Sequence, residues 1–190
     1  MTVKKNMFPI VELFYSLQGE GCYTGQAAVF IRLAGCRNAC PWCDAKHTWK
    51  AEDFPFLSIA EIVRQASVFP ARIAIVTGGE PLLYPLDELC RALHNKGFRT
   101  HLETSGVAPF SGEWDWVCLS PKRHRPPLAE AYKHAHELKV VIASAADFAW
   151  AEENARNVSP DCLLYLQPEW SCRQTVLPAI TQFSPLRLTV

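Results

Sequence analysis

The chain has 190 residues, 49% hydrophobic and 20% charged, and its 19 Lys and Arg residues balance its 19 Asp and Glu residues. This composition favours one compact domain over residues 1–190. The formal net charge of zero argues against the basic field that draws proteins onto nucleic acids or anionic membranes. Since no stretch approaches the roughly 18 apolar residues of a membrane span, we expect a cytoplasmic protein with neither nucleic acid nor membrane as a partner.

Six short apolar runs rich in Val, Ile and Leu predict buried strands, because each ends at Gly, Pro or Ser. In chain order they are AVFIRLAG, RIAIVTGG, FRTHLETSG, WVCLSP, LKVVIAS and LLYLQP. Helical segments separate them, and this alternation predicts right-handed crossovers and a parallel sheet. Six strands are too few for a closed eight-unit barrel. We therefore expect an α/β fold, a partial (β/α) barrel of about six parallel strands, open on one side.

Three helices have clear sequence signals. Ser58 and Glu61 form a capping box at the start of SIAEIVRQASVF. The segment LDELCRALHNKG carries its apolar residues on one helical face and ends at Gly97, a residue typical of helix carboxyl ends. Asp147 is the expected N-cap of DFAWAEENARN.

Unusual residues follow the carboxyl ends of five predicted strands. They read GC, TGGEP, ETSG, SPK and QP, in chain order. In parallel α/β sheets and barrels, the loops at this edge build the ligand site. We therefore expect five separate segments to face one pocket.

Three of the eight cysteines, Cys36, Cys40 and Cys43, lie within eight residues. A cluster of this kind without a secretion signal indicates metal binding rather than disulfides. Three thiolates leave one position open, which suits a cubane iron–sulfur cluster that also binds a small molecule. Zinc with Cys22 or His47 as a fourth ligand, at an unusual spacing, is an alternative, as are reduced structural thiols.

The C-x3-C-x2-C motif after the first strand, combined with Gly-Gly-Glu-Pro after the second, resembles the radical S-adenosylmethionine superfamily. The resemblance implies that Cys36, Cys40 and Cys43 hold a 4Fe-4S cluster whose open iron chelates S-adenosylmethionine. It also implies that an electron from the cluster cleaves this cofactor, and that the resulting 5′-deoxyadenosyl radical abstracts a hydrogen from the substrate.

Further segments resemble one family within that superfamily, the 7-carboxy-7-deazaguanine synthases of queuosine biosynthesis. The shared segments are LQGEG (17–21), FIRL (30–33), CPWCD (40–44), TGGEP (77–81), ETSG (103–106), SPK (120–122) and LQP (166–168). The resemblance implies a carbon–nitrogen lyase that contracts the ring of 6-carboxy-5,6,7,8-tetrahydropterin to 7-carboxy-7-deazaguanine and releases ammonia. It further implies a homodimer and an electron donor such as flavodoxin or ferredoxin.

The resemblance also assigns roles to individual residues. S-adenosylmethionine is expected at Trp42, Cys43, Asp44, Gly79, Ser120, Pro121, Lys122 and Gln167, and the pterin at Leu17, Gln18, Gly19, Arg32 and Thr77. The guanidinium of Arg32 offers a planar fork of donors for a carboxylate. The amide of Gln18 can both donate to and accept from the edge of a pterin ring.

Two features depart from the family. The family usually binds Mg²⁺ through a threonine after the Cys-Asp pair, and this chain has Ala45 there. We expect either that Asp44, Thr48, water and substrate hold the ion, or that the reaction proceeds without it. The family's final strand normally continues into Gln-Thr-His-Lys, whereas residues 187–190 read RLTV. We expect weaker substrate binding, contacts from other residues, or a sequence that lacks this segment.

Several residues have plainer interpretations. Arg32 is an ordinary partner for a surface carboxylate, Glu103 is a capping group, and the basic run 122–125 is a solvated loop or helps to read an anionic substrate. His134 and His136 are interpreted as surface residues. Two rival functions are a radical activase that acts on a partner protein, and a zinc-stabilised binding module without catalysis.

Overall fold

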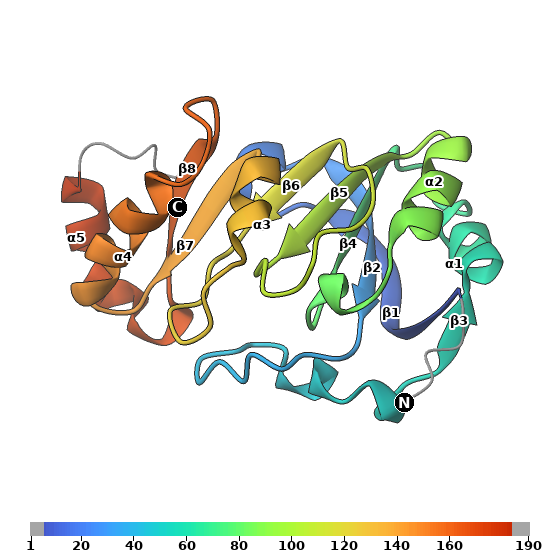
Figure 1. The fold of residues 1–190 in the computed structure, drawn as a ribbon, viewed down its shortest axis with the longest axis horizontal. Coiled ribbons are helices and arrows are strands. Elements are labelled where there is room, and N and C mark those ends of the chain that lie inside the picture. Colours follow the sequence, from blue (N-terminus) through green and yellow to red (C-terminus); the bar gives the residue numbers. More distant parts are fainter. Residues whose placement is uncertain (1–5, 184–190) are drawn as a thin grey trace.

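The computed structural model describes residues 6–183, which form an open eight-stranded sheet flanked by helices (Figure 1). The strand order is β3-β1-β2-β4-β5-β6-β7-β8. The six expected strands are all present and pair in parallel. They are β2 (Ala27–Leu33), β4 (Ile73–Gly78), β5 (Arg99–Thr104), β6 (Trp116–Leu119), β7 (Glu137–Ile142) and β8 (Leu163–Pro168). The predicted partial barrel of parallel strands is therefore confirmed, and its sheet stays unclosed.

Two antiparallel strands extend the sheet beyond the prediction. β1 (Met7–Leu17) forms a hairpin with β2, and β3 (Phe56–Ser58) pairs with the start of β1. The register of the hairpin shifts between Ile10 and Glu12, which marks a bulge in β1. The hairpin places the loop between β1 and β2 at the amino end of β2.

The described residues include five α-helices. They are α1 (Ile59–Ala66), α2 (Asp87–Asn95), α3 (Ala129–His134), α4 (Ala146–Ala155) and α5 (Arg173–Gln182). The capping box is confirmed, because Ser58 Oγ accepts a hydrogen bond from the backbone N–H of Glu61. Gly97 follows α2 with a φ of 83°, a left-handed conformation that favours glycine.

The expected N-cap role of Asp147 is wrong. Asp147 lies inside the first turn of α4, and Ala145 is the capping residue. The Asp147 carboxylate accepts hydrogen bonds from the backbone N–H groups of Ala143 and Ser144. The carboxylate thus accepts hydrogen bonds from N–H groups of the segment that leaves β7, and not from those at the start of the helix.

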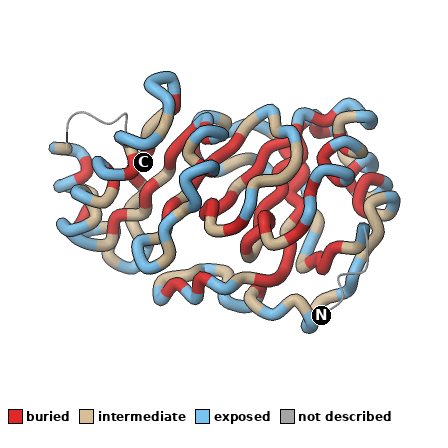
Figure 2. The backbone as a smooth tube through the Cα atoms, in the orientation of Figure 1, coloured by how far each residue is buried: buried red, intermediate tan, exposed pale blue. Residues whose placement is uncertain are grey.

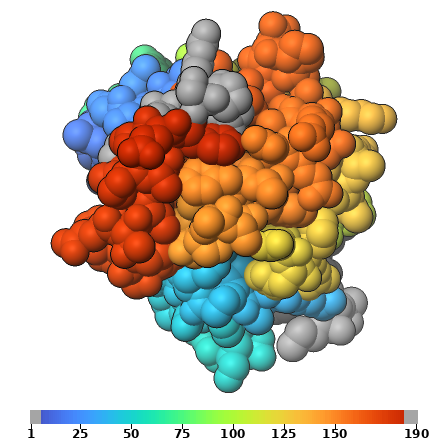
Figure 3. All heavy atoms as spheres, turned by 90° about the vertical axis from the view of Figure 1, so that its left-hand side faces the viewer, coloured from blue at the N-terminus to red at the C-terminus, as the bar shows by residue number. Residues whose placement is uncertain are grey.

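Three groups of buried side chains make the core, the smallest of which is Ala28, Phe30, Ile73 and Ile75 on β2 and β4. Of the two larger groups, one packs β1, β2, β4 and β5 against α1 and α2, and the other packs β7 and β8 against α4 and α5. Figure 2 shows that the buried residues follow the strands, while the helices expose their outer faces. Figure 3 views the end built by α4, α5 and β8, with the loop that follows β2 beneath them. Among residues 6–183, no helix combines the length and apolar character needed to cross a membrane.

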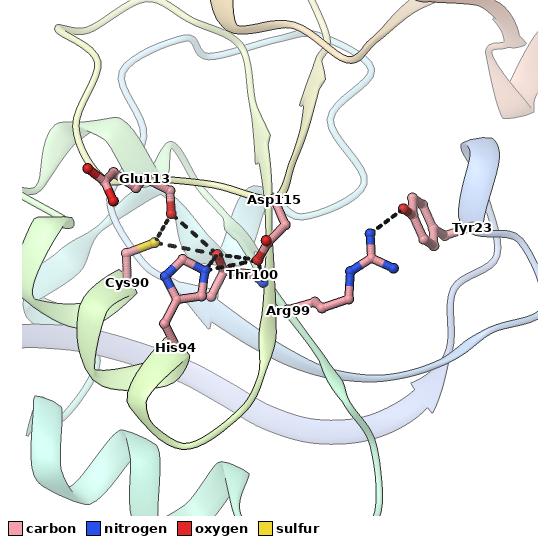
Figure 4. A network of polar contacts seen from close by, with 7 residues as sticks. All are labelled: Tyr23, Cys90, His94, Arg99, Thr100, Glu113 and Asp115. Atoms are coloured by element: carbon pink, nitrogen blue, oxygen red, sulfur yellow. Dashed lines mark hydrogen bonds and ion pairs between the residues drawn. The ribbon is translucent and has the colours of Figure 1, made fainter.

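A polar network fastens α2 to the amino ends of β5 and β6 (Figure 4). His94 Nε2 lies 2.9 Å from the hydroxyl of Thr100 and 2.9 Å from the carboxylate of Asp115. Asp115 also accepts a hydrogen bond from the backbone N–H of Thr100. Cys90 contacts the same hydroxyl from one turn earlier on α2. This network fixes the edge of the sheet opposite to the strand carboxyl ends.

Candidate active site

The loop after β2 carries the three clustered cysteines. Its ends are held together by hydrogen bonds from the backbone N–H of Gly35 to Thr48 O (2.7 Å) and from that of Cys36 to Trp49 O (3.1 Å). Gly35 has a φ of 95°, which suits the sharp turn out of the strand. The three cysteine side chains line one pocket of about 210 Å³ at the carboxyl edge of the sheet.

The cysteine thiols are reduced and partly shielded from solvent. Burial raises the pKa of Cys36 and of Cys40, and the charge of Lys122 counteracts this for Cys40. These two thiols are therefore protonated at neutral pH, and binding of a metal releases their protons.

The donor set fits an iron–sulfur cluster better than a single ion. Within residues 6–183, no three His, Cys, Asp or Glu side chains converge on one point that would hold a metal ion. A cubane instead takes each thiolate on a different iron, so its ligands need only to face a common space. Cys36, Cys40 and Cys43 meet that requirement.

The double glycine after β4 lets the strand end approach the cysteine loop. The backbone N–H of Gly79 donates to Leu33 O (2.9 Å), and that of Glu80 donates to Gly35 O (2.8 Å). A Cβ atom on Gly79 would lie 2.3 Å from Gly35 O, and one on Gly78 would lie 2.1 Å from Leu33 O. A side chain on Gly79 would therefore push the cysteine loop away, and one on Gly78 would collide with the end of β2.

Glu80 is buried and links three segments of the site. Its carboxylate accepts hydrogen bonds from the backbone N–H of Leu82 (3.1 Å) and of Ser105 (2.9 Å), and from the hydroxyls of Thr104 and Ser105. Asn38 of the cysteine loop donates to Ser105 Oγ (2.8 Å). The sequence interpretation quoted the TGGEP and ETSG motifs, yet it missed that Glu80, Asn38 and Ser105 connect them.

The SPK segment after β6 lies on the other side of the cysteines. Ser120 and Lys122 line the pocket together with Trp42. Lys122 donates to Ser120 Oγ (2.8 Å), and its ammonium lies 5.1 Å from the centre of the Trp42 ring, a cation–π contact. Burial lowers the pKa of Lys122, and the nearby charge of Lys139 lowers it further.

Two further residues of the basic run contact the cysteine loop, whereas Arg123 pairs with Asp147 of α4. His124 Nε2 donates to Asn38 O at 2.6 Å and lies 3.8 Å from Cys40 Sγ, and Arg125 donates to Arg37 O at 3.0 Å. Of residues 122–125, only Lys122 lines the pocket. Two residues of this run, His124 and Arg125, thus brace the loop that carries the cysteines.

The expected substrate residues Gln18 and Thr77 converge on Glu103. Gln18 Nε2 donates to Glu103 Oε1 (2.9 Å), and Thr77 Oγ1 donates to Glu103 Oε2 (2.7 Å). Burial alone would raise the pKa of Glu103, but Lys139, these two hydrogen bonds and Arg32 together lower it. Glu103 is therefore an ionised carboxylate in the pocket wall, and the capping role considered from the sequence is wrong.

Arg32 lines the same pocket but already has an anionic partner. Its Nε lies 2.6 Å from Glu12 Oε1, across the β1–β2 hairpin. Its guanidinium also lies 6.0 Å from the centre of the Phe14 ring. Because this ion pair uses Nε, the terminal nitrogens remain available to an incoming carboxylate.

Other expected contacts lie away from the pocket lining. Leu17 is 62% exposed, and a Cβ added to Gly19 would meet nothing within 4 Å. Neither of these two residues, nor Gln18, Pro121 or Gln167, lines the pocket. Conversely, Glu20 and Lys139 line it beside Glu103, and the sequence interpretation did not assign either of them. Residues 187–190 lie outside the described residues.

The two side chains expected to bind magnesium, Asp44 and Thr48, differ in whether they line the pocket. Asp44 and Ala45 line the pocket. Thr48 is buried, and its hydroxyl donates to Ala45 O at 2.8 Å. Asp44 is therefore the side chain of this group that faces the pocket with oxygen donors.

Comparisons with known proteins show the family of this chain. The model of the radical SAM superfamily matches residues 30–141. A 7-carboxy-7-deazaguanine synthase from Synechocystis sp. is 50% identical over 163 residues, covering 86% of this chain and 78% of that protein. The synthase of Flavobacterium psychrophilum is 46% identical over 180 residues, covering 95% and 85%. The crystal structure of QueE from Escherichia coli matches with a TM-score of 0.81 at 32% identity, covering 97% of this chain and 94% of that one. The chain therefore belongs to the radical SAM superfamily and, within it, to the family of 7-carboxy-7-deazaguanine synthases.

Proposed function

We propose that this chain is a carbon–nitrogen lyase that contracts the ring of 6-carboxy-5,6,7,8-tetrahydropterin to 7-carboxy-7-deazaguanine and releases ammonia. The observation that carries the proposal is a single pocket lined by the three cysteines on one side and by Arg32, Thr77 and Glu103 on the other. Family membership favours this function over the activase and the zinc-stabilised module.

Cys36, Cys40 and Cys43 would hold the 4Fe-4S cluster, with one iron left for S-adenosylmethionine. When bound, the cluster supplies the electron that cleaves this cofactor to a 5′-deoxyadenosyl radical. Trp42, Ser120 and Lys122 line the adjoining wall, where the Lys122 cation would bind the carboxylate of the cofactor. The protein's own contribution is to place the cofactor beside the substrate and to exclude water and oxygen.

The pterin would occupy the opposite wall. The Glu103 carboxylate accepts hydrogen bonds, so it suits the N–H edge of a pterin, while Gln18 and Thr77 fix its orientation. The terminal nitrogens of Arg32 would bind the substrate carboxylate. Leu17, Gly19, Pro121 and Gln167 stay predictions at this site.

The remaining roles rest on the family. A small redox protein such as flavodoxin or ferredoxin would supply the electron, and the chain would act as a cytoplasmic homodimer. Asp44 would supply the protein ligand to Mg²⁺, because its carboxylate lines the pocket and carboxylate oxygen is a preferred ligand of this ion.

Single substitutions of the clustered cysteines test the proposal. Cys36→Ala, Cys40→Ala and Cys43→Ala should each lose iron binding and the reductive formation of 5′-deoxyadenosine. Cys22→Ala is the matched control, because Cys22 is an exposed thiol on the β1–β2 loop. Retained cleavage of S-adenosylmethionine in all three cysteine variants would overturn the proposed mechanism.

A further inference from the structure

We infer that Glu137 and Lys139 of β7 are positioning residues that hold the loop of residues 18–26, and with it the carboxylate of Glu20, against the substrate side of the pocket. The inference deepens the proposed synthase function and rests on it. Nothing in the family resemblance assigned a role to either residue.

The contacts made by Glu137 and Lys139 join two parts of the sheet that are not neighbours. The loop joins β1 to β2, whereas β7 follows β2, β4, β5 and β6 in the strand order. The backbone N–H of Cys22 donates to Glu137 Oε2 at 3.0 Å, and Lys139 Nζ forms an ion pair with Glu20. These contacts therefore fasten the loop across the concave side of the open barrel.

Glu137 sets how closely the loop can approach β7. Glu137 is buried, and Gly21 above it has a φ of 71°. A Cβ atom on Gly21 would lie 2.3 Å from Glu137 Oε1. The left-handed backbone conformation favours glycine, and a side chain here would also displace the Glu137 carboxylate, which gives a physical reason for Gly21 in the LQGEG segment.

Lys139 lies two residues further along β7, so its side chain is on the same face of the strand as Glu137. Its side chain is 13% exposed, and it lines the pocket together with Glu20 and Glu103. Burial alone would lower the pKa of Lys139, but the Cys118 sulfur and the carboxylates of Glu103 and Glu20 outweigh burial and raise it. Lys139 is therefore a fixed cation between two carboxylates.

The loop's other backbone bonds stay within the hairpin. Gln18 N donates to Gln26 O, Gly25 N donates to Gln18 O, and Thr24 N donates to Gly21 O. Such bonds shape the loop but do not fix its distance from the pocket. The cysteine loop is held by Thr48, Trp49, Ser105 and His124, none of which belongs to β7. Loss of the β7 contacts should therefore affect the pterin and spare the iron–sulfur cluster.

The test compares Lys139→Met, Lys139→Arg, Glu137→Ala and Glu137→Gln in the iron-loaded protein. Lys139→Met should raise the KM for 6-carboxytetrahydropterin at least about tenfold and increase the 5′-deoxyadenosine formed per deazaguanine. Lys139→Arg keeps the cation, and Glu137→Gln keeps an acceptor for the backbone N–H of Cys22. In these two variants the KM should therefore stay close to the wild-type value. Iron content should not change. Lys133→Met, at an exposed position on α3, is the control.

Hydrogen exchange of the 18–26 peptide gives a second readout that is independent of turnover. Exchange should accelerate in Lys139→Met and in Glu137→Ala, and return toward the wild-type rate in the two conservative variants. Unchanged exchange together with an unchanged KM would overturn the inference. Loss of iron from Lys139→Met or Glu137→Ala in proportion to the loss of turnover would overturn it as well. If the wild-type protein makes no deazaguanine, the proposed function fails, while the exchange result still decides whether β7 positions the loop.

Discussion

The backbone N–H of Ser105 donates a hydrogen bond to the buried carboxylate of Glu80 at 2.9 Å, and the Ser105 hydroxyl donates to the same oxygen. These two residues follow neighbouring parallel strands, β4 and β5. Through Asn38, which donates to Ser105, the pair also reaches the cysteine loop. The carboxyl edge of the sheet is therefore braced around one buried carboxylate.

Replacement of Glu80 should destabilise the protein. Glu80→Ala leaves several buried donors without an acceptor, and each unsatisfied donor costs about 1–3 kcal/mol. We expect a total loss of roughly 3 kcal/mol or more in the free energy of unfolding, measured by denaturant titration of the iron-free protein. Glu88→Ala, which removes an exposed i,i+3 ion pair with Arg91, should cost less than about 1 kcal/mol. Equal losses in the two variants would contradict the bracing role of Glu80.

Gly79→Ala should disturb the cysteine loop. The added methyl group would lie 2.3 Å from Gly35 O, which is backbone and cannot rotate away. We expect less iron bound per chain after anaerobic reconstitution, together with a lower melting temperature. Gly19→Ala is the control, because a Cβ there meets nothing within 4 Å. Normal iron binding in Gly79→Ala would show that the loop tolerates the displacement.

Arg32→Met should weaken substrate binding. If the guanidinium binds the pterin carboxylate, its loss removes a charge-assisted hydrogen bond worth about 1.5–3 kcal/mol, so the KM should rise roughly 10–100-fold. Iron content and cleavage of S-adenosylmethionine should persist. Glu12→Gln should leave the KM near the wild-type value, because Glu12 contacts only Nε in the ion pair. An unchanged KM in Arg32→Met would mean that Arg32 serves only its contact with Glu12.

Stability should fall as the pH drops from about 6.5 to 4. Burial, assisted by the charge of Arg99, lowers the pKa of His101 to about 4. An unfolded histidine has a pKa of about 6.5, so between these values the unfolded chain binds more protons than the folded one. His101 therefore makes its full contribution to the free energy of unfolding above about pH 6.5. This contribution, about 3 kcal/mol in all, is lost as the pH falls to about 4.

His101→Phe should flatten this part of the pH profile. Phenylalanine keeps an aromatic ring against Tyr23, whose ring centre lies 4.4 Å from that of His101. Urea unfolding at several pH values measures the difference. His136, whose pKa is also lowered, should retain a smaller dependence in the same window. An unaltered profile in His101→Phe would assign the acid sensitivity to other groups.

The sequence predicted the parts of the site that depend on short-range patterns. Each parallel strand is a short apolar run that ends at Gly, Pro or Ser. The edge of the sheet that carries the pocket was therefore predictable. β1 was missed because MFPIVELFYSL contains a proline, a glutamate and three aromatic residues, and its register shifts at a bulge. Lys139 and Glu20 were missed because 119 residues separate them, and no local pattern signals such a pair.

Side-chain roles were the hardest to predict. Asp147 has the residue type of an N-cap, but the free N–H groups at the end of β7 claim its carboxylate. Glu103 likewise looks like a cap in isolation. Its role depends on Gln18, in the loop after β1, and on Thr77 of β4. Such choices are made by tertiary contacts between segments distant in sequence.

The most direct test of the proposed function is anaerobic turnover of the reconstituted protein with S-adenosylmethionine, a reductant and 6-carboxytetrahydropterin. Deazaguanine and 5′-deoxyadenosine are followed by mass spectrometry, with and without Mg²⁺. We expect 7-carboxy-7-deazaguanine to form in step with 5′-deoxyadenosine. Formation of 5′-deoxyadenosine without any deazaguanine, in both the presence and the absence of Mg²⁺, would contradict the assignment of the pterin as the substrate.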